Sequence, residues 1–418
     1  MSNSPALARR LGTFDASLIG LGSMIGAGVF AAFTPAATAA GSGLLVGLVV
    51  AAFVAFCNAT SSAQLAAAYP TSGGTYIYGR ERLGPWYGFL AGWGFVIGKT
   101  ASAAAMAMTF AAYAAPAGWE RPVAIAAVVL LTTVNYHGVT RTAGLTRILV
   151  VAVLAALAIA VSAVWGGPGP QLSNVLGDGL LAHGWYGILQ SAGLLFFAFA
   201  GYARIATMGE EVRDPRRAIP RAIGIALGIA IVIYAVIAVT LLAALGPAGV
   251  AESTTPLASA VSSGTLAWAA PVVRVGAAVA SLGALLALIA GLGRTSLAMA
   301  REHDLPSALA AVHHKYKVPH RAEVSVAVVI CVVIAVADLR GAIGFSSFGV
   351  LLYYLVANVA AFTQQAEDRR YPKFLQVAGA IACVVLVATL PPLSIGLGVL
   401  MFVVGIVYRL VRHGSTRG

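Results

Sequence analysis

The stretch Gly20-Leu21-Gly22-Ser23-Met24-Ile25-Gly26-Ala27-Gly28 lies in the middle of a long apolar segment, residues 14–38. A segment of this length is able to cross a lipid bilayer, which takes about 20 mostly apolar residues. Four glycines in nine positions, each about 1 kcal/mol less favourable than alanine, make a poor continuous helix. In lipid, a break is tolerated only where the freed backbone groups face protein, water or a ligand. We therefore predict a broken membrane helix here.

A second break is expected in the apolar segment 186–209, which contains Phe196-Phe197-Ala198-Phe199-Ala200-Gly201-Tyr202-Ala203. Taken alone, the glycines of the first segment are explained at least as well by close helix packing, since small residues let backbones approach. Paired interruptions in two halves of a chain favour a transporter's binding site midway through the membrane. The two segments are the first and the sixth, which is the spacing of two five-helix repeats with inverted topology.

Ten further apolar runs raise the expected number of transmembrane helices to about twelve. These runs lie near residues 42–67, 85–114, 121–137, 144–165, 220–245, 267–299, 322–338, 341–363, 374–390 and 393–411. The expected fold class is an all-α integral membrane protein. Its expected parts are a cytoplasmic N-terminal tail (1–13), a first inverted repeat (14–165), a second inverted repeat (186–363), two C-terminal helices (374–411) and a cytoplasmic tail (412–418).

Composition and charge agree with a lipid environment. Of the 418 residues, 60% are hydrophobic and only 10% are charged, whereas soluble proteins carry roughly 25% charged residues. The net charge of +12 does not indicate nucleic-acid binding, because the basic residues recur in short patches between apolar runs. If the N-terminus is cytoplasmic, all but four of the 26 Lys and Arg residues fall on the cytoplasmic side; the exceptions are Lys99, Arg121, Arg274 and Arg340. This asymmetry predicts a multi-pass protein of a bacterial inner membrane with both termini in the cytoplasm.

The two breaks offer complementary backbone chemistry. Where the first helix restarts, around residues 26–30, unpaired N–H groups and the positive end of a helix dipole suit a carboxylate. Freed carbonyls near Leu21 and Gly22, and near Phe199 and Ala200, suit an ammonium group. A site with donors at one end and acceptors at the other fits a zwitterionic α-amino acid.

Four collinear motifs between residues 14 and 320 resemble the amino acid–polyamine–organocation transporters. They are Ile19-Gly20-Leu21-Gly22-Ser23-Met24-Ile25-Gly26-Ala27-Gly28-Val29-Phe30, Tyr69-Pro70-Thr71-Ser72-Gly73-Gly74-Thr75-Tyr76-Ile77-Tyr78, Phe197-Ala198-Phe199-Ala200-Gly201-Tyr202 followed by the loop 209–220, and Ala298-Met299-Ala300-Arg301-Glu302-His303-Asp304-Leu305-Pro306. The third motif is similar to the cationic amino acid transporter branch. The resemblance implies two inverted five-helix repeats, two added helices and alternating access.

The resemblance also implies the residues of the binding site. The substrate carboxylate would lie against the backbone of Ser23, Met24, Gly26, Ala27 and Gly28. The amine would lie against the sixth-helix break, at Phe196, Ala200, Gly201 and Ala203, with Phe197 or Phe199 as an aromatic gate. Two positions depart from relatives. Ala203 stands where cationic-branch members often have an acidic residue, and Val153 stands where several relatives place a lysine.

Lys99 is the one Lys or Arg deep inside a predicted helix, about 21 Å along from Pro85 at 1.5 Å per residue. A charge buried in a membrane is costly and marks a functional site by default. A buried lysine that no anion compensates also gives up its proton more readily, so Lys99 is the candidate for a coupling proton. The resemblance also implies that Lys99 is a substrate-binding residue, because the third helix lines the pocket in relatives. The alternative is a structural amine bound to backbone carbonyls of a neighbouring broken helix.

Charged residues at the expected cytoplasmic face are candidates for a gate. Glu210, Glu211 and Asp214 adjoin several arginines, and we expect Asp15 to pair with Arg294 or Arg301. The alternative is a solvated ion-pair loop, in which each pair contributes little. The histidines of residues 303–320 match no closed metal site, and we expect neither a metal nor a cofactor.

The sequence as a whole predicts a transporter of a neutral amino acid, either secondary active and coupled to protons or an exchanger. A cationic amino acid or polyamine substrate is the alternative within this class. A membrane-embedded enzyme or a non-transporting sensor is the alternative from another class, but no catalytic constellation and no soluble signalling domain is visible. The oligomeric state is left open.

Overall fold

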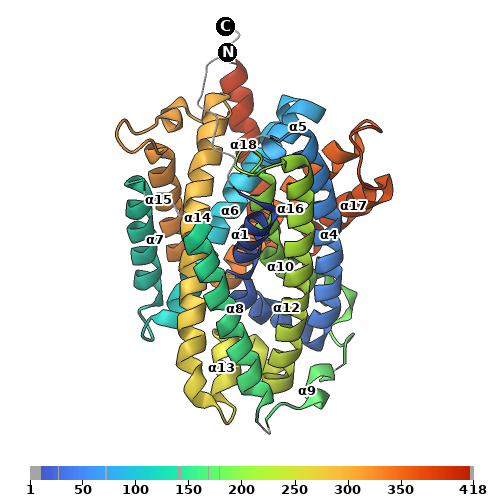
Figure 1. The fold of residues 1–418 in the computed structure, drawn as a ribbon, viewed down its shortest axis with the longest axis vertical. Helices are drawn as coiled ribbons and strands as arrows, with labels where there is room; N and C mark the ends of the chain where they lie inside the picture. The colour runs from blue at the N-terminus through green and yellow to red at the C-terminus, as the bar shows by residue number, and fades with distance from the viewer. Residues whose placement is uncertain are drawn as a thin grey trace.

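The fold is a bundle of α-helices, as seen in a computed structural model that describes residues 11–26, 28–70, 73–138, 143–167, 169–177 and 179–414 (Figure 1). Its longer helices are α1 (Thr13–Ile25), α3 (Phe33–Ala40), α4 (Leu44–Ala68), α5 (Thr75–Leu83), α6 (Pro85–Ala114), α7 (Glu120–Tyr136), α8 (Ala143–Trp165), α10 (Gly184–Phe199), α12 (Pro215–Glu252), α14 (Ala270–Arg301), α15 (His320–Val336), α16 (Leu339–Phe362), α17 (Lys373–Thr389) and α18 (Pro392–Gly414). Short helices α2 (Gly28–Ala31), α9 (Leu172–Leu176), α11 (Ala203–Ala206) and α13 (Pro256–Ser262) lie between them.

The expected all-α membrane fold is confirmed. Among the described residues, nine helical segments are long and apolar enough to cross a membrane. Helices α7, α15 and α17, of 17 residues each, occupy the places of the fourth, ninth and eleventh predicted helices. Large apolar side chains such as those of Val49, Leu130 and Val232 are exposed on the outside of the bundle, where lipid replaces water as the solvent.

Equivalent helices of the two halves make equivalent contacts. Helix α1 packs against α12, and α10 packs against α4; likewise α8 packs against α14, and α16 packs against α6. Glycines allow the closest of these approaches, since a Cβ on Gly349 of α16 would lie 2.6 Å from the carbonyl oxygen of Gly94 in α6. This paired arrangement is the one that a five-helix repeat leads us to expect, while the exact bounds of the repeats stay a prediction.

The two ends of the bundle differ in their connecting segments. Helix α5 and the end of α18 lie at one end, called the α5 end, whereas α9 and α13 lie at the opposite end (Figure 1). Helices α5, α9 and α13 fall in stretches that we had expected to be loops. Helix α12 is kinked at Gly246, which has φ of 66°, directly after the predicted end at residue 245, and a further helical stretch continues to Glu252.

Candidate functional site

The first predicted break lies between α1 and α2. Helix α1 ends at Ile25, Gly26 has φ −53° and ψ −101°, and α2 begins at Gly28. The helix then continues, because Ala32 is in the right-handed helical region and leads into α3. Ala27 lies outside the described residues. At the restart, the first backbone N–H groups have no partner within their own helix.

The second break is a tight turn rather than an unwound segment. Helix α10 ends at Phe199, a 3-10 turn covers Ala200–Tyr202, and α11 begins at Ala203. A 3-10 turn changes the hydrogen-bonding partners of the backbone at an α-helix end. Carbonyl oxygens at this point are therefore available to side chains from other helices.

The two breaks touch each other. A Cβ on Gly201 would lie 2.4 Å from the carbonyl carbon and oxygen of Ser23. A Cβ on Gly28 would lie 2.7 Å from the Cα of Ala198. These glycines therefore serve close packing, which is the alternative raised above, and at the same time they bring two interrupted backbones together. A Cβ on Gly26 would likewise lie 2.6 Å from the Cβ of Ala284 in α14.

One hydroxyl from a third helix joins both breaks. The Tyr234 hydroxyl, on α12, lies 2.8 Å from the carbonyl oxygen of Met24 and 2.9 Å from that of Ala198, and the two oxygens share its one proton. Both carbonyls lie beside a helix interruption, where the regular backbone partner is lost. The sequence did not single out Tyr234, although its phenol is a polar group in an otherwise apolar stretch.

Lys99 lies at the second break. Its Nζ donates to the carbonyl oxygen of Ala200 at 3.2 Å, and the residue is only 7% exposed. The Tyr354 hydroxyl donates to the same oxygen at 3.4 Å. The amine is thus tied to a carbonyl of a broken helix, as the structural alternative predicted. That carbonyl is also the one expected to accept a substrate ammonium.

The aromatic residues of α10 do not share one environment. The ring of Phe196 packs edge-on against Tyr354 at 5.7 Å, and the ring of Phe199 packs edge-on against Tyr234 at 4.9 Å. Both phenylalanines are fully buried, whereas Phe197 retains slight exposure. Phe199 is therefore a packing residue of the break in this conformation, and Phe197 is the better candidate for a gate.

Comparison with known proteins assigns this chain to a family. Residues 11–413 match the family described as amino acid permease. The chain belongs to that family. It is 56% identical over 411 residues to an uncharacterized transporter of Mycobacterium tuberculosis, an alignment that covers 98% of this chain and 93% of the relative.

The names of more distant relatives of this permease state their substrates. A branched-chain amino acid permease of Bacillus subtilis is 24% identical over 403 residues, which covers 90% of this chain and 85% of the relative. A chloroplastic cationic amino acid transporter of Arabidopsis thaliana is 26% identical over 385 residues, which covers 85% of this chain and 65% of the relative.

The permease pairs Asp15 differently from our expectation. Arg147 of α8 donates to the Asp15 carboxylate, with Nε 2.9 Å from Oδ1, so the expected pairing with Arg294 or Arg301 is wrong. The physical reason is that α1 packs directly against α8. The candidate gate residues Glu210 and Glu211 lie in the turn after α11.

That turn is tied to the segment ahead of α1. The backbone N–H of Leu11 donates to the carbonyl of Glu211 at 3.1 Å, and the N–H of Arg213 donates to the carbonyl of Leu11 at 2.9 Å. Leu11 and Val212 thereby form an isolated parallel bridge. This contact, called the Leu11–Val212 bridge, joins the outer ends of the two broken helices.

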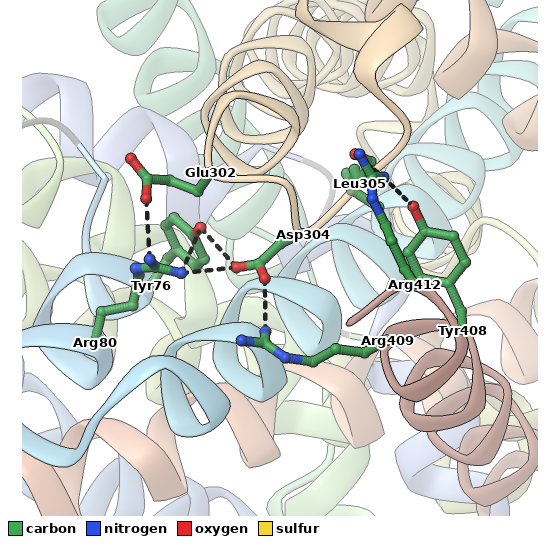
Figure 2. Close-up of polar contacts among 8 residues, drawn as sticks. All are labelled: Tyr76, Arg80, Glu302, Asp304, Leu305, Tyr408, Arg409 and Arg412. Carbon is green, nitrogen blue, oxygen red and sulfur yellow. Dashed lines mark hydrogen bonds and ion pairs between the residues drawn. The ribbon is translucent and has the colours of Figure 1, made fainter. Parts of the chain in front are cut away.

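A second polar cluster, not predicted from the sequence, lies at the α5 end (Figure 2). The buried Asp304 carboxylate, 1% exposed, accepts from Arg80 at 3.0 Å, from Arg409 at 2.6 Å and from the Tyr76 hydroxyl at 2.8 Å. Arg80 also pairs with Glu302 at 2.9 Å. The cluster therefore ties α5 and α18 to the segment that follows α14.

Proposed function

We propose that this permease transports a neutral α-amino acid by alternating access, as a secondary active carrier coupled to protons or as an exchanger. The observation that carries the proposal is the direct contact between two helix interruptions in the interior of the bundle. Gly201 lies against Ser23, and Tyr234 bridges Met24 and Ala198. In membrane transporters, paired interruptions of this kind form the substrate site.

The proposed carboxylate position is the start of the helix that runs from Gly28 to Ala40. The first amide groups of this helix and its positive dipole end attract an anion. Ser23, Met24, Gly26 and Ala27 would complete the backbone around it. Ala27 is assigned here from the sequence alone.

The proposed amine position is the 3-10 turn of the second break. Backbone carbonyls of this turn accept hydrogen bonds, as the contact between Lys99 and Ala200 illustrates. The neighbouring Ala203 offers no carboxylate for a cationic side chain, and Lys99 adds a positive charge. Both features favour a neutral side chain on the substrate, with Phe197 as the residue that closes over it.

Alternating access requires that one end of the bundle open while the other stays closed. In the described conformation, the Leu11–Val212 bridge and the pair of Asp15 with Arg147 hold the α5 end together. We assign the α5 end to the cytoplasm of a bacterial cell, because basic residues dominate the connections there. Glu210 and Glu211, in the turn held by the bridge, belong to the proposed gate.

Uptake into proteoliposomes tests the proposal. Radiolabelled leucine, alanine, arginine and spermidine are each supplied, with and without imposed pH and sodium gradients. Saturable uptake of a neutral amino acid that excess unlabelled substrate abolishes is the expected result. Uptake of arginine or spermidine alone would support the cationic alternative, which the similarity to a cationic amino acid transporter favours. No uptake or exchange of any of these compounds would refute the proposed function.

A further inference from the structure

Two amines compete for one carbonyl oxygen in this permease. We propose that the Lys99 ammonium is a tethered stand-in for the α-amino group of the substrate. It holds the Ala200 carbonyl while the site is empty and leaves that carbonyl when an amino acid binds. This inference rests on the proposed function and adds a requirement to it: the substrate must carry an ammonium group able to displace Lys99.

The geometry supplies the shared acceptor. The Ala200 carbonyl belongs to the 3-10 turn of the second break, and both Ala200 and Lys99 are buried. Lys99 Nζ lies 3.2 Å from this oxygen. Because a lysine carries its amine on a flexible four-carbon stem, the ammonium is able to leave the oxygen without movement of α6. An α-amino group placed on the same oxygen would therefore take over the position that Lys99 vacates.

The charges make the two occupants mutually exclusive. Two ammonium groups on one oxygen would lie only a few ångströms apart, where unit charges in a low-dielectric interior repel strongly. All ion pairs resolved in the described part of the chain are made by arginines, so Lys99 has no carboxylate among them that would anchor it. A contact with a carbonyl dipole alone is easier to exchange than an ion pair.

The replacement of Lys99 by the substrate amine on the Ala200 carbonyl has a consequence for the transport cycle. Without Lys99, the side-chain contact left to the Ala200 carbonyl in an empty carrier would be the longer one to Tyr354, at 3.4 Å. Leaving a buried acceptor poorly satisfied is unfavourable. With Lys99 in place, the empty carrier resembles the loaded carrier at this oxygen and is able to change conformation without substrate. Lys99 thus permits net uptake in addition to exchange.

Reconstituted Lys99→Met tests this consequence, because methionine keeps the length of the side chain and removes the ammonium. Exchange of internal for external leucine is measured in the same vesicles as the reference rate. The ratio of net leucine uptake into empty vesicles to leucine exchange should fall by about tenfold, as expected for a poorly satisfied buried carbonyl. The matched control is Lys373→Met, an exposed lysine whose ammonium lies 4.6 Å from the ring of Phe362; it should change neither rate.

The two proposals fail in different ways. If the wild type neither exchanges nor accumulates any amino acid, the proposed function is wrong. If the wild type transports leucine and Lys99→Met keeps the wild-type ratio of net uptake to exchange, the function stands and the role of Lys99 is refuted.

A measurement on the wild type covers the case in which Lys99→Met does not fold. Reductive methylation followed by mass spectrometry reports the reactivity of each lysine amine, with Lys373 as the internal reference. Saturating leucine should raise the methylation of Lys99 several-fold, whereas N-acetylleucine, which lacks the ammonium, should not. Unchanged or reduced methylation of Lys99 with leucine would overturn the inference.

Discussion

The substitution Tyr234→Phe isolates the one hydroxyl that joins the two broken helices. It removes the hydrogen bonds to Met24 and Ala198 but keeps the ring, whose edge-on contact with Phe199 at 4.9 Å remains possible. Hydrogen bonds inside membrane proteins contribute roughly 0.6 kcal/mol on average and about 1.7 kcal/mol at most. The hydroxyl has one proton, which the two carbonyl oxygens share, so its removal predicts a loss of about 0.6–1.7 kcal/mol in the described conformation.

Thermal unfolding of the purified protein in detergent measures this loss. Tyr234→Phe should melt about one to two degrees lower than the wild type, and its transport should weaken because the two interruptions are no longer held together. The control is Tyr186→Phe, which removes a hydroxyl from an exposed tyrosine on the same helix as the second break. Equal melting of all three proteins, with unchanged transport, would show that the Tyr234 hydroxyl does not stabilise the breaks.

Three further changes test other parts of the structure. Gly201→Ala should abolish transport, because its Cβ would lie 2.4 Å from the backbone of α1, whereas Gly224→Ala, with no atom within 4 Å, should be tolerated in the same uptake assay. Asp304→Asn should lower stability by roughly 3–5 kcal/mol, the cost of removing one charge of a buried ion pair, whereas Glu302→Gln, at a half-exposed side chain, should cost less than about 1 kcal/mol in the same unfolding assay. Partial desolvation and neighbouring positive charges lower the pKa of His313, so the loop binds more protons when unfolded than when folded, and the folded loop should lose stability as pH drops below about 6.5. Hydrogen-exchange protection around His313, corrected for the intrinsic pH dependence of exchange, that does not fall between pH 7.5 and 5.5 would contradict this.

Gly28→Leu would place a side chain at the proposed carboxylate position, but it does not test that position alone. A Cβ at Gly28 would already lie 2.7 Å from the backbone of Ala198. A leucine there would therefore disturb the packing of α10 as well, and loss of binding alone would not identify a carboxylate site.

The breaks and the membrane fold were predictable because their signals are local. Runs of about 20 apolar residues indicate spanning helices, and clustered glycines indicate a poor helix wherever they occur. The depth of Lys99 followed from counting residues along one helix. Each of these inferences needs only a stretch of neighbouring residues.

The contacts between distant residues were not predictable in the same way. Asp304, Arg80 and Arg409 lie in three separate parts of the chain, and nothing in their local sequences states that they meet. The predicted partner of Asp15 was wrong for the same reason. The residue type suggested an arginine, but the packing of α1 against α8 brings Arg147 to Asp15. Tyr234 was missed because a single tyrosine in an apolar helix has no periodic or motif signal.

The Leu11–Val212 bridge gives the chain ahead of α1 a mechanical role. Because the segment before α1 hydrogen-bonds to the turn after α11, tension on it is transmitted to both interrupted helices at once. A rigid protein fused immediately before Leu11 would load this linkage, whereas a fusion separated by a long flexible spacer would not. The choice of linker at this end is therefore a means to bias the carrier toward one conformation without altering any residue of its binding site.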